Sequence, residues 1–123
     1  MTDPRTAILE SRRIAAIWAG LLLAPAAFLV NLELGYLVVR PSCLQGSVLP
    51  VHLVHLATMV LALLGALVAW RTWRLEGATW PGDAGGPPAR TRFMGGLGLV
   101  TSALFVLTML AQWIPSFVLH PCQ

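Results

Sequence analysis

The sequence predicts an all-α membrane protein with three transmembrane helices, its N-terminus in the cytoplasm and its C-terminus in the periplasm. Of the 123 residues, 57% are hydrophobic and only 11% are charged, whereas about a quarter of a soluble domain is charged. The apolar residues also gather into three runs of about 20 residues or more, the length of a membrane-spanning helix. We expect one membrane domain over residues 1–123, with spans at about 14–39, 51–70 and 93–114.

The first span, residues 14–39, is interrupted only by Pro25, Asn31 and Glu33. Because backbone polar groups in lipid must be paired within the segment, the run should be helical. Pro25 lacks an N–H and is a candidate site for a kink. Two arginines before the run also fit a signal peptide. The apolar residues continue well beyond the small-residue site around Pro25, however, which favours an uncleaved helix.

The arginines predict the orientation of the chain. Cytoplasmic loops of membrane proteins carry an excess of positive charge. Only Arg40 falls in the loop 40–50 or the C-terminal tail, and there is no lysine. The other seven arginines precede the first span or follow the second: Arg5, Arg12, Arg13, Arg71, Arg74, Arg90 and Arg92. We therefore expect the N-terminus and the loop 71–92 to be cytoplasmic, and the loop 40–50 and the C-terminus to lie outside, in the periplasm if the host is Gram-negative.

The same loop, residues 71–92, is rich in Gly and Pro. Its first few residues are candidates to extend the second helix, whereas PGDAGGPP at 81–88 should not continue a helix and should be mobile. The arginines flank apolar runs and form no stripe beside aromatic residues, so we expect no nucleic-acid partner. The partners that the composition indicates are the lipid bilayer and other membrane proteins.

Two cysteines follow helices that point outward. Cys43 lies four residues after the first span, and Cys122 is the penultimate residue. The expected topology places both in an oxidising compartment, where disulfides persist. We expect a Cys43–Cys122 disulfide that ties the loop 40–50 to the C-terminal tail. Two independent thiols and a copper site that uses the thiols are the alternatives.

Four polar residues from the three spans share one depth near the outer end: Asn31, Glu33, His55 and Gln112. Glu33 lies about 9 Å inside the membrane, where an ionised carboxylate is costly, so we expect it to face the bundle interior. The first expected partner of Glu33 is His55 and the second is Arg40. Three roles for the cluster stay open: hydrogen bonds that stabilise packing, a surface for a larger membrane partner, and a proton or metal site.

Small residues occupy the cytoplasmic half of the bundle at roughly four-residue spacing. They are Ala16, Gly20, Ala24, Ala62, Gly65, Ala66, Ala69, Gly95, Gly96, Gly98 and Ser102. Such spacing lets helices approach closely. We expect tight helix packing there and looser, polar packing in the outer half.

The histidines are the remaining candidates for chemistry. His52 and His55 lie one turn apart on one helix face, and with His120, Met59 and the two cysteines they form a candidate set of ligands for a soft metal, copper or zinc. Because His52 and His55 share a helix, they cannot both ligate one haem iron. GGLGL at 95–99 opens a span and follows no strand, so it is no dinucleotide loop. We therefore expect no enzyme activity and no cofactor, with copper as the alternative.

Four segments carry a resemblance to other proteins. They are WAGLLLAPAAFLVNLELGY in the first span, the cysteine after it, HLVHL at the start of the second span, and AQWIPSFVLHPCQ at the end. With these the chain resembles small three-helix proteins of the bacterial inner membrane encoded near haem–copper cytochrome c oxidase genes. The resemblance implies a link to a terminal oxidase or another respiratory or photosynthetic membrane complex.

The function we expect is therefore that of a non-enzymatic accessory subunit or assembly factor of such a complex. The alternative is a periplasm-facing copper-binding protein that aids metallation of an oxidase through His52, His55 and His120. A third class is a transporter or channel component. Three spans with one intramembrane carboxylate fit that class only if the chain oligomerises.

Overall fold

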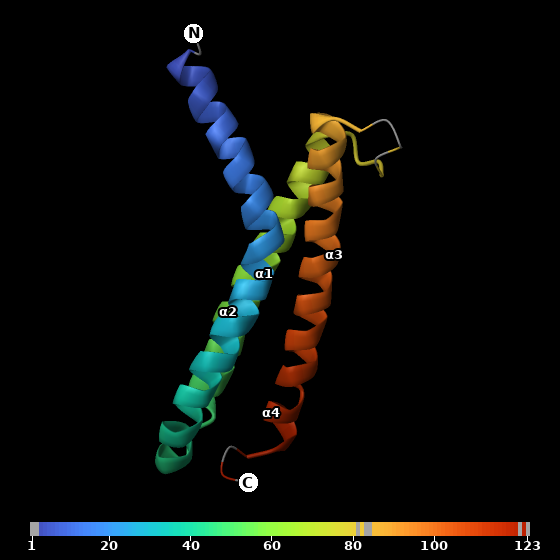
Figure 1. The fold of residues 1–123 in the computed structure, drawn as a ribbon. Helices are drawn as coiled ribbons and strands as arrows, with labels where there is room; N and C mark the ends of the chain where they lie inside the picture. Colours follow the sequence, from blue (N-terminus) through green and yellow to red (C-terminus); the bar gives the residue numbers. More distant parts are fainter. Residues whose placement is uncertain (1–2, 81, 83–84, 121, 123) are drawn as a thin grey trace.

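Three long helices make up almost all of the computed structural model, which describes residues 3–80, 82, 85–120 and 122 (Figure 1). The helices are α1 (Pro4–Gln45), α2 (Leu49–Leu75), α3 (Pro87–Trp113) and the single turn α4 (Pro115–Val118). The described residues include no strand. Helices α1 and α2 and the α3–α4 segment are each long and apolar enough to cross a membrane. This confirms the predicted all-helical fold with three candidate spans, as expected of a multi-pass membrane protein.

The helices are longer than the predicted spans. Helix α1 continues through Pro41 to Gln45, so the connection to α2 is only residues 46–48 and not the predicted loop 40–50. Gly46 ends α1 with φ of 64°, a left-handed conformation that glycine adopts without steric cost, and its N–H donates to the Cys43 carbonyl. Hydropathy marks only the segment inside the hydrocarbon, and the helical backbone continues beyond it.

The predicted loop 71–92 is also shorter than expected, because α2 extends to Leu75 and α3 begins at Pro87. Pro87 and Pro88 form the first turn of α3, where a missing N–H costs no hydrogen bond. The stretch 81–88 does not continue the second helix, as predicted, because α2 ends at Leu75; its last two prolines instead begin α3. The predicted mobility of that stretch falls partly on residues 81, 83 and 84, which lie outside the described residues.

Alanines and two methionines form the centre of the bundle. The core cluster consists of Ala24, Ala27, Met59, Ala62 and Met109, with partly buried Phe28, Phe105, Val106 and Trp113 packed against it. Large aliphatic side chains point outward instead, among them Leu22, Leu29, Leu63 and Leu107. This arrangement suits lipid, because helix association in a membrane depends on close packing and not on removing apolar surface from water.

All three helices approach one another closely at Gly20, Ala69 and Gly98. A Cβ atom added to Gly20 would lie 3.0 Å from the Ala69 Cα, and one added to Gly98 would lie 2.9 Å from the Gly20 carbonyl oxygen. Both distances are shorter than ordinary carbon contacts, so neither position has room for a side chain. The tight packing predicted from the small residues is therefore confirmed, and α1, α2 and α3 all contact one another.

Candidate functional site

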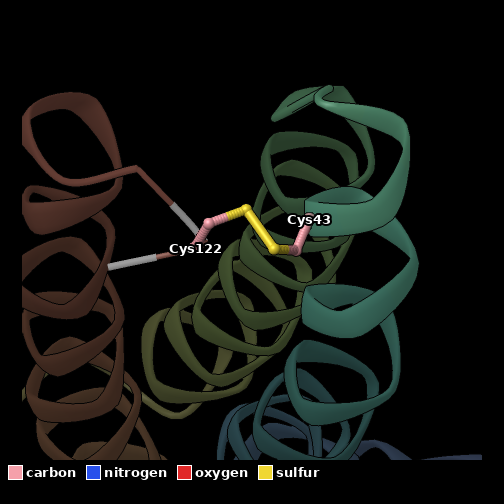
Figure 2. The surroundings of a disulfide bond; sticks show 2 residues. All are labelled: Cys43 and Cys122. Atoms are coloured by element: carbon pink, nitrogen blue, oxygen red, sulfur yellow. A yellow bond between two sulfur atoms is a disulfide. The ribbon is translucent and has the colours of Figure 1, made fainter.

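A disulfide joins Cys43, in the last turn of α1, to Cys122, which follows α4 (Figure 2). The two Cα atoms are 5.2 Å apart, although the residues are separated by 79 positions in the chain. The pairing predicted from the sequence is thus present in the structure. It fixes the C-terminal tail against the end of α1, on the far side of the bundle from the N-terminus (Figure 1).

An aromatic cluster near the disulfide joins the start of α2 to the end of α3. The indole N–H of Trp113 donates to Nδ1 of His52 over 2.9 Å, so the proton of this imidazole lies on Nε2. The Phe117 ring packs on His52 with ring centroids 4.8 Å apart. The His55 ring stacks on the indole of Trp113, with ring centroids 6.1 Å apart and an interplanar angle of 13°.

Asn31 faces the interior of the bundle from α1 and is only 3% exposed. Its Oδ1 accepts a hydrogen bond of 2.9 Å from the hydroxyl of Thr58 on α2, for which the Val54 carbonyl is a second acceptor. Interhelical bonds of this kind average about 0.6 kcal/mol in membrane proteins. Thr58 was not among the site residues predicted from the sequence. The antiparallel pairing of α1 and α2 explains its position. Gly20 of α1 lies against Ala69 of α2, so Asn31, eleven residues after Gly20, lies opposite Thr58, eleven residues before Ala69.

Glu33 does not face the bundle interior, and that prediction is wrong. Its side chain is exposed on the outer surface of α1, because two residues of helix rotate it about 200° away from Asn31. Among the described residues it forms neither of the expected ion pairs, with His55 or with Arg40. The Nδ1 atom of His55 instead donates to the Val51 carbonyl, 3.0 Å away in its own helix.

The other three predicted polar residues do come together. Asn31, His55 and Gln112 line an open groove of about 240 Å³ that is completed by Leu32, Gly35, Tyr36 and Val39. Gln112 is half-buried, and within the described part of the chain its buried Oε1 has no hydrogen-bond partner. The lining therefore combines the polar side chains of Asn31, His55 and Gln112 with other residues of α1, among them Tyr36, which is 84% exposed.

The candidate copper residues are not gathered in one place. Within residues 3–80, 82, 85–120 and 122, no three His, Cys, Asp or Glu side chains lie close enough to hold one ion. His120 lines a separate hollow with Val39 and Pro115. His52 and His55 each use Nδ1 in a hydrogen bond, and both sulfurs are in the disulfide. Of these two imidazoles, only that of His55 retains a free ring lone pair, on Nε2, because in His52 Nδ1 accepts from Trp113 and Nε2 carries the proton.

The structure thus provides two surfaces that could contact another molecule at the disulfide end. One is the groove above Asn31, His55 and Gln112, and the other is the exposed face of α1 that carries Glu33. Comparison with known proteins finds no matching family model, no matching curated protein and no matching solved structure. The function is therefore inferred from the residues of this chain.

Proposed function

We propose that this chain is a non-enzymatic accessory subunit or assembly factor of a bacterial respiratory or photosynthetic membrane complex. The resemblance of its sequence favours a terminal oxidase as the partner. In this proposal the protein resides in the inner membrane with its N-terminus in the cytoplasm and its disulfide in the periplasm, as the arginine distribution indicates. The single observation that carries the proposal is the exposed carboxylate of Glu33, with which no side chain of the described residues pairs.

An exposed glutamate inside a span is an expensive feature. A charged side chain at the centre of a membrane helix costs about 2.5–3.5 kcal/mol on insertion scales, and less toward the interface. Glu33 lies about 10 Å below Arg40 along the axis of α1, and no described side chain pairs with it. A helix of another membrane protein that offers a hydrogen-bond donor or a cation at this depth would remove that cost.

The neighbours of Glu33 support a protein partner. Tyr36 and Arg40 follow on the same side of α1 at spacings of three and seven residues, and both are exposed. We call Glu33, Tyr36 and Arg40 the α1 polar face. Tyrosine and arginine are enriched in protein–protein interfaces, and the adjoining groove lies directly beside Tyr36. Together they form one continuous surface that a partner helix would cover.

The substitution Glu33→Leu separates this role from a structural one. If Glu33 contacts a partner, the tagged variant should purify from native membranes in mild detergent without the complex that accompanies the original chain. The isolated variant should be at least as stable to unfolding as the original chain, because an exposed carboxylate is replaced by an apolar side chain that suits lipid. Mass spectrometry of the co-purified proteins and an unfolding titration measure the two effects.

The matched control is Leu63→Ala, which changes a lipid-exposed side chain on α2 and should retain the complex. The conservative change Glu33→Gln should retain part of it, because an amide can still form a hydrogen bond. Recovery of the full complex with Glu33→Leu would contradict the proposal, as would a clear loss of stability of the isolated chain. Recovery of a complex without oxidase subunits would contradict the choice of partner.

A further inference from the structure

A hollow lies at the end of the molecule opposite the disulfide. It has a volume of about 480 Å³ and separates the first turns of α1 from the start of α3. The helices diverge at this end. In Figure 1 the N-terminal part of α1 leans away from α3, whereas the remainder of α1 runs beside α2. The residues that matter for its chemistry are Glu10, Arg13, Ile17, Trp18, Arg90 and Met94. We call this hollow the α1–α3 cleft.

The cleft combines a cationic rim with apolar walls. On α1, Arg13 is followed one turn later by Ile17 and Trp18, and on α3 Arg90 is followed one turn later by Met94. Both helices therefore place a guanidinium about 6 Å along the axis from the apolar residues that begin the span. Trp18 is half-exposed to the cleft region, at the level where tryptophan is enriched in membrane proteins.

The charges of the cleft favour an anion. Arg13 already forms an ion pair with Glu76, the residue that follows α2. Arg90 has no ion-pair partner among the described residues, so its guanidinium is available to a ligand. Glu10 is the one acidic residue of the lining. The first turn of α3 has no side-chain cap, and its partial positive charge adds to that of Arg90.

We propose that the α1–α3 cleft binds one anionic glycerophospholipid. The lipid phosphate contacts the guanidinium groups of Arg90 and Arg13 at the rim of the cleft. An acyl chain lies against Ile17, Trp18 and Met94. A basic pocket between membrane helices at the end of their spans is the form that such sites take. Only a ligand with both an acidic head and an apolar chain matches both parts of the cleft. The site requires membrane insertion of the chain but not the proposed respiratory partner.

Lipid titrations of the purified full-length chain in neutral detergent test the site. The probes are phosphatidylglycerol and phosphatidylcholine with identical chains, with brominated chains to quench Trp18, and Trp18→Phe supplies the background from the other tryptophans. Binding of one phosphatidylglycerol per chain is expected, at least tenfold tighter than phosphatidylcholine. Arg90→Gln should weaken it about fivefold, the factor that corresponds to about 1 kcal/mol per basic residue near the surface.

The matched control is Arg71→Gln, which removes an exposed arginine at the end of α2 that does not line the cleft. It should leave the affinity unchanged. Because Arg90 is exposed, its substitution should not alter the helical content, which circular dichroism checks. Equal binding of the two lipids, equal losses with Arg90→Gln and Arg71→Gln, or displacement of the lipid by millimolar inorganic phosphate alone would each overturn the proposal.

Discussion

Gly98→Leu is expected to detach α3 from the other two helices. The first added carbon would already lie 2.9 Å from the Gly20 carbonyl oxygen and 3.3 Å from the Ala69 Cβ. The contacted oxygen belongs to the backbone of α1, so it cannot move unless the whole helix moves. Gly98→Ala should therefore cost about 1–3 kcal/mol, the usual penalty for overpacking, and Gly98→Leu should cost more and abolish the packing.

The helices themselves should survive this change. Each helix satisfies its backbone hydrogen bonds internally, so separated helices remain stable in lipid or detergent. Far-ultraviolet circular dichroism should stay unchanged, while the near-ultraviolet signal of the packed tryptophans should disappear and the unfolding midpoint should fall. The signal to follow includes Trp73, because a Cβ added to Gly95 would lie 3.1 Å from its backbone.

Gly35→Ala is the matched control on α1. A Cβ atom added there meets no atom within 4 Å, so the change should be neutral or should stabilise the helix by about 0.5–1 kcal/mol. If Gly98→Leu proved as stable as Gly35→Ala, the close approach of Gly20, Ala69 and Gly98 would be wrong.

Loss of the disulfide is expected to have the second-largest effect. The paired change Cys43→Ser and Cys122→Ser should lower the free energy of unfolding by about 2–4 kcal/mol, because the bond links residues 79 positions apart. The lower end of this range is expected in a membrane, where inserted helices already restrict the unfolded chain. The measurement is an unfolding titration under non-reducing conditions, together with the rate of proteolysis of the C-terminal tail.

A reductant provides the control for the disulfide. It should destabilise the original chain by about as much as the serine substitutions do, and it should have no effect on the double-serine variant. Equal stability of the oxidised and reduced chain would show that the Cys43–Cys122 bond adds nothing to the packing of the tail.

The fold class followed from composition, and the disulfide followed from the topology that the arginines indicate. The predicted orientation of Glu33 was wrong because the depth of a residue in the membrane does not determine which side of the helix it lies on. The side of α1 that faces the bundle could have been predicted from the spacing of its small residues. Gly20, Ala24, Ala27 and Asn31 are all buried and follow one another at intervals of four, three and four residues, the spacing of a packed helix face.

That stripe assigns Asn31 to the interior and leaves Glu33 outside it. Contacts that depend on how the helices tilt could not be predicted in the same way. The hydrogen bond from Trp113 to His52 requires the end of α3 to lie over the start of α2. The α1–α3 cleft requires the first turns of α1 to diverge from α3. Neither the tilt nor the divergence leaves a periodic pattern in the sequence.

The central claim is that the chain crosses the membrane three times and carries its disulfide outside the cytoplasm. The most direct measurement is the activity of a reporter enzyme that folds only in an oxidising compartment, fused after Gln123 or inserted in the loop between α2 and α3. We expect activity for the C-terminal fusion and none for the loop insertion. An inactive C-terminal fusion combined with an active loop insertion would contradict it.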